Sequence, residues 1–339
     1  MLKVALVYNL IHPETLSPQS PIDAIAEYDS PETVQAVQTA LEEGGNQVIL
    51  LEADEHIAEK LLATRPDIVF NIAEGRRGLY RESHVPAICE MLGIPYTGSD
   101  PLTLALALDK ARAKQILIYH GVPTARYQIF WEATDQLDPD LRFPLIVKLL
   151  REGSSMGLTP DSVVDDEEAL RRQVARLLNT YHEPAIVEQF ILGREFTVGV
   201  LGNHPPRVLP IIELVFPSPR DIVFFSPDDV VLERFPALRD KPLPCPRHRP
   251  VCPAEVSPAL KAAIEETALR AYRALGCLDW CRMEMRLGQD GQLYVLEMNP
   301  IAGIDPSYWF ARAARAAGLS YADFVNTILQ SACERYGLA

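Results

Sequence analysis

An Asp-Gly pair between two runs of alternating apolar and polar residues, near the C-terminus, constrains the fold of this chain more than any other feature. The pair is Asp290-Gly291, and the runs are Cys281–Leu287 and Gln292–Asn299. Asp-Gly in this setting is typical of the two-residue turn that joins antiparallel strands. We therefore predict a β-hairpin here, with its register counted outward from a two-residue turn.

The predicted register places two carboxylates opposite each other, since Glu284 falls opposite Glu297. Arg282 falls opposite Asn299 on the same face, because strand side chains alternate. Like charges opposed across a ladder are destabilising, and two carboxylates with an amide oxygen suit a hard cation such as Mg²⁺. The alternative is a solvated sheet face on which Arg282 neutralises the glutamates.

The size and composition of the chain allow several hydrophobic cores. It has 339 residues, of which 48% are hydrophobic, enough for two or three domains. The apolar face of the hairpin is predicted to face one of these cores, through Met283, Met285, Leu296 and Met298.

Charge and apolar pattern argue against two classes of partner. A net charge of −14 opposes binding to nucleic acid through its phosphates. No apolar run approaches the roughly 18 residues of a membrane helix, and residues 1–10 predict a first strand, not a signal peptide. The six cysteines include no CxxC pair, which indicates reduced thiols in a cytoplasmic enzyme.

The first hundred residues alternate between predicted strands and helices. The strands are Val4–Tyr8, Gln47–Leu51 and Asp67–Asn71, and the helices are Pro31–Glu43, Ile57–Ala63 and Glu82–Leu92. Such alternation predicts an α/β domain with a parallel sheet covered on both faces. Ligands bind at the carboxyl ends of strands in such sheets, where residues 9–30 and 71–81 emerge.

We divide the chain into three predicted units, residues 1–103, 104–183 and 184–339. The second unit contains strands Tyr127–Phe130 and Leu145–Leu149 and a helix at Glu167–Leu178. The third begins with strands and continues through a Pro-rich stretch predicted to be a long loop, a helix, the hairpin and two short helices. Its strands are Ile186–Phe190, Glu195–Leu201 and Arg207–Leu214. The loop is Phe216–Pro253, and the first helix is Pro258–Leu275.

A lysine and a loop in the second unit could bind phosphate. Lys148 lies in an otherwise apolar strand, where a lysine is costly unless it is paired. It could contact a nucleotide phosphate or protect an edge strand from pairing. In the loop Gly153–Gly157, Ser154 and Ser155 allow backbone N–H groups to turn toward an anion, although ordinary turns have the same composition.

Two glutamates stand at the ends of predicted strands. Glu188 closes one apolar strand, and Glu195 opens the next. Either could be an exposed strand-end carboxylate. Either could instead accept a hydrogen bond from an adenine amine or a ribose hydroxyl.

The order of these motifs resembles the ATP-grasp superfamily and, within it, the D-alanine–D-alanine ligase family. The series is Asp109-Lys110, Val147–Gly157, Glu188–Glu195, Arg282–Glu284 and Leu296–Gly303, and the likeness continues through Ile94–Ser99, Val251–Glu255 and Ala271–Cys277. The resemblance implies an α/β ATP-grasp fold, in which an N-terminal parallel α/β domain precedes two α+β subdomains that clasp ATP.

The resemblance also assigns roles to residues. Nucleotide contacts fall to Lys110, Lys148, Ser154, Ser155, Glu188, Phe190, Glu195 and Glu297. Ligands for Mg²⁺, or for Mn²⁺ in its place, are Glu284, Glu297 and Asn299. Catalytic roles fall to Arg282, which would stabilise a tetrahedral intermediate, to Ser154 beside the substrates, and to Glu27, which would bind the ammonium of the first substrate.

The implied reaction joins two small amino-acid-like substrates. A carboxylate attacks the γ-phosphate of ATP to give an acyl phosphate, and an amine then displaces phosphate to form an amide. The resemblance further implies a homodimer in the cytoplasm.

The substrate side departs from the family pattern in three segments. A segment that lines the substrate site and carries His in the ligases reads Asn71–Gly78 in this chain, and Arg81 follows it. The arginines of this wall are either surface charges or a site that binds an additional substrate carboxylate. Residues 224–230 lack the family's Tyr and Lys. After Gly303, Tyr308 stands at or beside the serine that binds the second substrate, and Ser307 could replace it after a one-residue shift.

These departures favour a carboxylate–amine ligase outside cell-wall synthesis whose second substrate is not D-alanine. A genuine D-alanine–D-alanine ligase with a divergent loop is the first alternative. A non-catalytic ATP-binding scaffold or sensor, and a kinase that stops after phosphoryl transfer, are the others.

Overall fold

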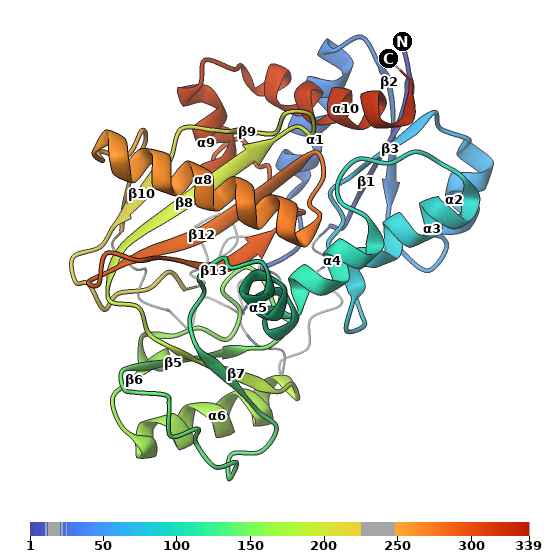
Figure 1. The fold of residues 1–339 in the computed structure, drawn as a ribbon. Coiled ribbons are helices and arrows are strands. Elements are labelled where there is room, and N and C mark those ends of the chain that lie inside the picture. The colour runs from blue at the N-terminus through green and yellow to red at the C-terminus, as the bar shows by residue number, and fades with distance from the viewer. Residues whose placement is uncertain (11, 13–20, 22, 25, 225–247, 339) are drawn as a thin grey trace.

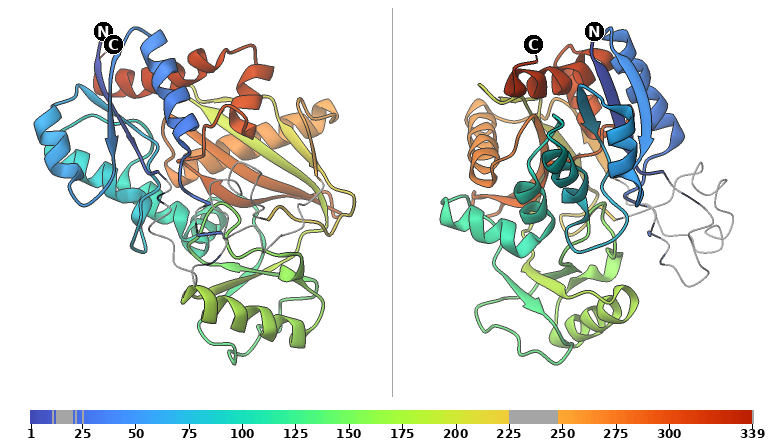
Figure 2. Two further views of the ribbon diagram at one scale, coloured as in Figure 1. Left: turned by 180° about the vertical axis from the view of Figure 1, so that it is seen from behind. Right: turned by 90° about the vertical axis from the view of Figure 1, so that its right-hand side faces the viewer.

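Three separate sheets organise the chain. The computed structural model describes residues 1–10, 12, 21, 23–24, 26–224 and 248–338. Within these ranges, the chain forms first a three-stranded, then a four-stranded and then a six-stranded sheet. Both chain ends lie at the same end of the molecule (Figures 1 and 2). The predicted architecture, an N-terminal parallel α/β domain followed by two α+β units, is confirmed.

The N-terminal sheet is parallel, as predicted. Its strands are ordered β2-β1-β3. The elements are β1 (Lys3–Tyr8), α1 (Pro31–Glu43), β2 (Gln47–Glu52), α2 (Ile57–Thr64), β3 (Ile68–Asn71), a 3₁₀ turn (Arg81–Ser83) and α3 (His84–Leu92). Helix α1 begins where predicted because Ser30 caps it, with its Oγ accepting a hydrogen bond from the Thr33 backbone N–H at 3.1 Å.

The central sheet has the order β4-β7-β5-β6, and helices α4 (Pro101–Leu108) and α5 (Lys110–Tyr119) lead into it. The sheet elements are β4 (Tyr127–Phe130), β5 (Leu145–Leu149), a 3₁₀ turn (Pro160–Ser162), β6 (Val163–Val164), α6 (Glu167–Tyr181) and β7 (Ala185–Gln189). We placed the last strand in the third unit, but β7 pairs antiparallel with β4 and β5. A boundary at 183/184 therefore cuts through the central sheet, because α6 returns the chain into that sheet.

The C-terminal sheet has the order β11-β10-β8-β12-β13, with β9 beside β8. The elements are β8 (Gly193–Leu201), β9 (Arg207–Val208), β10 (Ile212–Val215), β11 (Arg249–Val251), α8 (Pro258–Leu275), β12 (Trp280–Gly288), β13 (Leu293–Asn299), α9 (Trp309–Ala316) and α10 (Tyr321–Tyr336). The single strand predicted at Arg207–Leu214 is wrong. It is interrupted before Ile212 at Pro210, which has no N–H for the ladder.

The hairpin register is confirmed at the polar pairs but not at the turn. Glu284 lies opposite Glu297, as predicted. The predicted two-residue turn is wrong, since the Gly288 N–H donates to the Gln292 carbonyl across a three-residue loop. A bulge at Glu284/Met285 adds one residue on β13 and cancels the shift.

The same bulge redirects one side chain. Met283, Met285 and Met298 are buried, as predicted for the core face. Leu296, which we also assigned to that face, instead lines the cleft between the central and C-terminal sheets. A bulge turns the side chain of its extra residue away from the alternating pattern.

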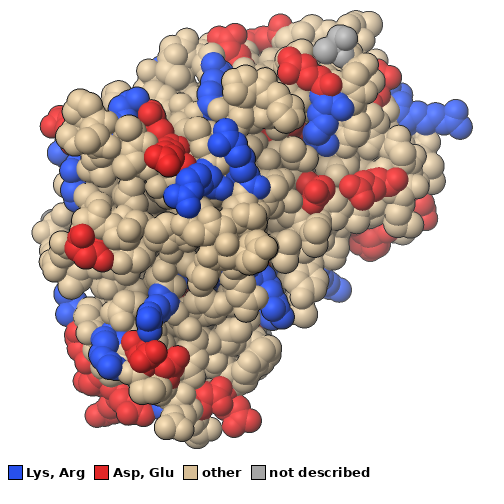
Figure 3. All heavy atoms as spheres, in the orientation of Figure 1, with Lys and Arg blue, Asp and Glu red and all other residues tan. Residues whose placement is uncertain are grey.

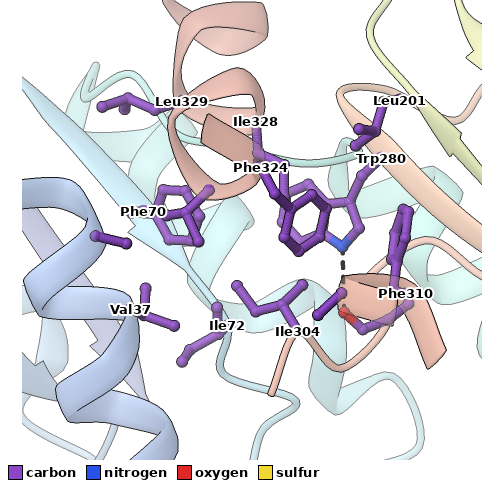
Figure 4. Close-up of a cluster of buried hydrophobic side chains, with 14 of the residues drawn as sticks. Val37, Phe70, Ile72, Leu201, Trp280, Ile304, Phe310, Phe324, Ile328 and Leu329 are labelled. Atoms are coloured by element: carbon purple, nitrogen blue, oxygen red, sulfur yellow. Dashed lines mark hydrogen bonds between the residues drawn. The ribbon is translucent and has the colours of Figure 1, made fainter. Parts of the chain in front are cut away.

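A shared core joins the N-terminal sheet to the C-terminal unit. The rings of Phe70 and Trp280 stack with their centroids 6.3 Å apart and their planes at 10° (Figure 4). The indole Nε1–H of Trp280 donates to the Ala302 carbonyl at 3.2 Å. This bond ties the start of β12 to the loop that follows β13, so both ends of the hairpin are held in place.

The surface carries charged side chains of both signs (Figure 3). Acidic and basic side chains are interspersed on the face shown in Figure 3. Among the described residues, no helix is long and apolar enough to cross a membrane.

Candidate functional site

Most of the predicted site residues line one cleft of about 120 Å³ between the central and C-terminal sheets. They are Lys148, Ser154, Ser155, Glu188, Phe190, Glu195, Arg282, Glu284, Glu297 and Asn299. Five predicted residues do not line it, namely Glu27, Lys110, Gly303, Ser307 and Tyr308. A wider groove of about 770 Å³ between α1 and α10 contains none of the predicted residues.

Each of the two opposed carboxylates has a cation supplied by the protein. Arg282 Nε donates to Glu284 Oε1 at 2.7 Å, and Lys110 Nζ lies 3.1 Å from Glu297 Oε1. Burial acts to raise the pKa of Glu297, but the charges of Lys110 and Lys148 outweigh it and lower that pKa. At Glu284, burial and the charge of Glu297 outweigh Arg282 and raise the pKa, so the protein's own cations relieve the repulsion predicted from the register only in part.

The donor atoms themselves fit a hard divalent cation. Asn299 Nδ2 donates to Glu284 Oε2 at 2.8 Å, and its amide oxygen makes no hydrogen bond with the described residues. That oxygen and the two carboxylates form an all-oxygen set, which suits Mg²⁺ or Mn²⁺. No group of three or more His, Cys, Asp or Glu side chains occurs in the described ranges that could hold a metal by itself.

Glu188 lies between two lysines of the central unit. Its Oε1 is 3.1 Å from Lys114 Nζ, and its Oε2 is 3.1 Å from Lys148 Nζ. Burial opposes the charge of Glu188, but the two lysines lower its pKa to about 2. The carboxylate thus holds the Lys148 side chain at the cleft, and Glu188 itself also lines that cleft.

Lys114 was absent from the predicted site. It lies one helical turn after Lys110 on α5 and is 1% exposed. The i, i+4 spacing of two lysines on one helix face was the signal available in the sequence. Lysines so placed repel each other unless acids face them, and here Glu188 and Glu297 do.

Glu195 is held by a second residue that the sequence did not single out. Arg286 Nε donates to Glu195 Oε2 at 2.7 Å, and Arg286 is 2% exposed. Its guanidinium lies over the rings of Phe190 and Phe216, at 4.7 and 5.9 Å from their centroids. Alternation along β12 places Arg286 on the same face as Arg282 and Glu284, which is the signal that could have identified it.

The loop between β5 and the 3₁₀ turn carries strained backbone where it meets the cleft. Ser154 and Ser155 have φ angles of 47° and 60°. Non-glycine residues seldom adopt such angles, and neighbouring structure must hold them there. Ser154 and Ser155 both line the cleft, and residues 150–159 are called the lid loop below.

Glu27 binds the protein itself rather than facing an open site. Its Oε2 accepts hydrogen bonds from Arg81 Nε at 3.0 Å and from Nη2 at 2.5 Å, and its Oε1 accepts from the Gly153 N–H at 2.8 Å. Arg81 Nη2 also donates to Glu152 Oε2 at 2.7 Å. The N-terminal domain is therefore fastened to the lid loop through one buried arginine.

The remaining arginines of this wall do not form a second anion site. Arg76 pairs with Glu52, and Arg77 is exposed. The two carboxylates that Arg81 contacts, Glu27 and Glu152, belong to the protein. The arginines that we considered as receptors for an extra substrate carboxylate are thus either paired internally or on the surface.

Several carboxyl groups with raised pKa values lie near Glu27. Burial is the main cause that raises the pKa of Glu82 to about 8, and the charge of Glu27 adds to it. Burial likewise raises the pKa of Asp29 to about 8, with help from Asp305. The pKa of Glu74 is raised for the same reasons. Because their pKa values are raised to about 8, Glu82 and Asp29 favour the protonated form at neutral pH.

The loop after β13 does not present Ser307 as a free donor. Ser307 Oγ lies 2.5 Å from Asp305 Oδ1, and Thr33 Oγ1 donates to Asp305 Oδ2 at 2.7 Å. Tyr308 is 55% exposed and precedes α9. Trp309, which we did not predict, lines the cleft instead. Of the loop expected to lack Tyr and Lys, residues 225–230 lie outside the described ranges.

Comparison with known proteins agrees with this geometry. The family model described as D-ala D-ala ligase C-terminus matches residues 116–330. A D-alanine–D-alanine ligase of Desulforudis audaxviator is 35% identical over 306 residues, which cover 89% of this chain and 92% of that protein. Protein y4sG of Sinorhizobium fredii, described as uncharacterized, is 35% identical over 309 residues, covering 89% and 87%.

A solved structure supports the fold. The D-alanine–D-alanine ligase from Bacillus anthracis, complexed with ATP, aligns with a TM-score of 0.73 over 99% of each chain, at 20% sequence identity. The family model and the sequence relatives together extend over the central and C-terminal units that form the cleft. This chain belongs to the D-alanine–D-alanine ligase-like family of ATP-grasp ligases.

Proposed function

We propose that this protein is an ATP-dependent carboxylate–amine ligase that joins two amino-acid-like substrates through an acyl phosphate. The observation that carries the proposal is the convergence of Lys148, Glu297 and Arg282 on one cleft between two sheets. A cation, a metal-ligating carboxylate and an oxyanion-stabilising arginine are the groups that phosphoryl transfer followed by acyl transfer requires.

The bond changes define what each residue does. A carboxylate oxygen of the first substrate attacks the γ-phosphorus of ATP, and the bond to ADP breaks. The amine of the second substrate then attacks the carbonyl carbon, the carbon–oxygen bond to phosphate breaks, and the amine proton passes to solvent. Lys148 and Lys110 would neutralise phosphate charge, and the ion pair with Glu188 holds Lys148 in place.

A divalent cation would be held by Glu284, Glu297 and the amide oxygen of Asn299. When bound, it would neutralise charge on the phosphate oxygens. The protein's own contribution is the spacing of these ligands, which the hairpin ladder fixes by setting Glu284 opposite Glu297. Arg282, anchored through Nε to Glu284, leaves its terminal nitrogens available to an oxyanion.

The identity of the second substrate is the finer part of the proposal. Several relatives are named D-alanine–D-alanine ligase. We propose that the acceptor here is not D-alanine, because Ser307 is hydrogen-bonded to Asp305 and the family likeness puts Tyr308 at or beside the family's serine position. A site built around a different set of polar groups discriminates strongly against the wrong ligand.

A panel of D- and L-amino acids, presented singly and in pairs with MgATP, tests both parts. ADP release and mass detection of the product are measured together. We expect an amide from at least one pair other than two D-alanines. An amide only from two D-alanines would overturn the acceptor assignment, and ATP binding without any turnover would favour the scaffold alternative.

A further inference from the structure

Trp309 lines the cleft, yet the roles described so far give it no function. It is the first residue of α9 and directly follows Tyr308. Its neighbour Phe310 points into the shared core, where it packs against Phe324 with ring centroids 5.1 Å apart. The two adjacent aromatic residues therefore lie in different surroundings, and only Trp309 lines the cleft.

The Arg282 guanidinium lies over the Trp309 ring, with Cζ 5.6 Å from the ring centroid. The one hydrogen bond that Arg282 makes with the described residues runs from Nε to Glu284. Neither terminal nitrogen has a hydrogen-bond partner in the described ranges. A single bond at Nε leaves the planar head free to rotate about it, whereas contact with a flat ring restricts that rotation.

The Trp309 ring is itself supported from behind. His248 meets it edge-on, with centroids 5.8 Å apart and planes at 81°, and Phe216 lies 5.7 Å from His248. Trp309 and Phe216 both pack against the shared core. The ring is thus a fixed platform, and Arg282 is the polar group that rests on it.

We propose that Trp309 is a positioning residue for the ligase reaction, whose indole face holds the Arg282 guanidinium with its terminal nitrogens directed at the carbonyl oxygen of the reacting acyl group. The catalytic consequence rests on the proposed function, but the positioning itself does not. An arginine held in its working orientation before the substrates bind needs no reorganisation as negative charge develops on that oxygen.

Arginine side-chain NMR tests the positioning without any substrate. The ¹⁵Nε–¹H signal of Arg282 is assigned by its loss in Arg282→Lys, and its chemical shift and hydrogen-exchange rate are compared among variants. Trp309→Leu should move the signal and speed exchange about tenfold, whereas Trp309→Phe should stay within about threefold of wild type. An unchanged shift and exchange rate in Trp309→Leu would overturn the proposal.

Phe310→Leu is the matched control, because it removes a buried aromatic ring from the same helix without touching Arg282. It should lower the melting temperature but leave the Arg282 signal unchanged. If Phe310→Leu moves that signal as far as Trp309→Leu does, the effect comes from helix packing and the proposal is wrong.

Steady-state kinetics tests the catalytic consequence with the substrate pair that the panel identifies. Trp309→Leu should lower kcat about tenfold while leaving the KM for ATP unchanged, and Trp309→Phe should recover most of the rate. Wild-type kcat in Trp309→Leu would overturn that consequence. If no pair turns over, the proposed function fails, and the NMR result still decides whether Trp309 positions Arg282.

Discussion

The nucleotide side and the substrate side of this protein are both rich in charge, but they organise it differently. On the nucleotide side, the charged groups stand on regular elements: Glu284 and Glu297 on a hairpin, Lys110 and Lys114 on α5, and Lys148 and Glu188 on paired strands. Ladder and helix geometry fixes their spacing, and each acid has a cation within about 3 Å.

On the substrate side, the charged groups stand on loops and short turns from all three units. Arg81 joins Glu27 of the N-terminal domain to Glu152 of the lid loop. Around them, Glu82 is buried and Asp29 and Glu74 are partly buried, and withdrawal of their carboxyl groups from water is the main cause that raises the pKa values of all three. Chemistry that is common to a family can thus reside on rigid elements, while substrate choice resides on segments that can change independently.

The largest effect should come from the nucleotide side. Glu297→Gln removes a metal ligand and the partner of Lys110, so turnover should fall by at least about 10³-fold while the fold is kept, because metal charge stabilisation is worth several kcal/mol. ADP release and circular dichroism are measured together. Glu168→Gln, on an exposed part of α6, is the matched control and should keep full activity. Full activity in Glu297→Gln would remove the metal assignment.

On the substrate side, the matching change is Arg81→Gln. It leaves Glu27 and Glu152 buried without their common cation, which should destabilise the protein by about 3 kcal/mol. Urea unfolding measures the difference. The double variant with Glu27→Gln should recover part of the loss. If Arg81→Gln unfolds at the wild-type urea concentration, the two units are not fastened here.

A smaller effect tests whether the pairing of Lys114 with Glu188 keeps Lys148 in position to bind the nucleotide. Lys114→Met removes one of the two cations on Glu188, so Lys148 should be drawn toward Glu188 and away from phosphate. We expect the KM for ATP to rise about tenfold, equivalent to ~1.4 kcal/mol. Lys261→Met, on the exposed side of α8, serves as the control. An unchanged KM in Lys114→Met would show that Lys148 does not depend on this pair.

A pH-dependent effect concerns the substrate side alone. Asp29 has a pKa of about 8 in the folded protein, against 3.8 for the ordinary group. Because the folded pKa is the higher one, its favourable contribution is complete below about pH 4 and is lost as pH rises to about 8. Asp29→Asn should therefore become more stable relative to wild type as pH rises from 4 to 8. Melting temperatures of the variant and the wild type that change equally with pH would contradict the raised pKa of this carboxyl.

The difference between the two sides also explains what the sequence could predict. Alternation along β12 and β13 set Glu284 opposite Glu297 correctly, although the turn is one residue longer than predicted and a bulge makes up the difference. Periodicity reports which face a residue occupies over several positions, and it does not detect a single extra residue. Leu296 was misplaced for this reason.

Contacts between loops carry no such periodic signal. Glu27 meets Gly153 across 126 positions of sequence, and Thr33 meets Asp305 across 272. The sequence identified Glu27 only through family likeness. Nothing in it indicated that Arg81 would form an ion pair with that carboxylate. Trp309 was missed because an aromatic residue at a helix start is more often part of a core, as Phe310 is.

Isotope transfer provides the most direct test of ligase chemistry at this cleft. The first substrate, identified by the amino-acid panel, is labelled with ¹⁸O in its carboxylate, and the released phosphate is analysed by mass spectrometry. Attack of that carboxylate on the γ-phosphorus predicts one ¹⁸O atom in each phosphate released with the amide. Unlabelled phosphate, or label in AMP instead, would contradict the acyl-phosphate route.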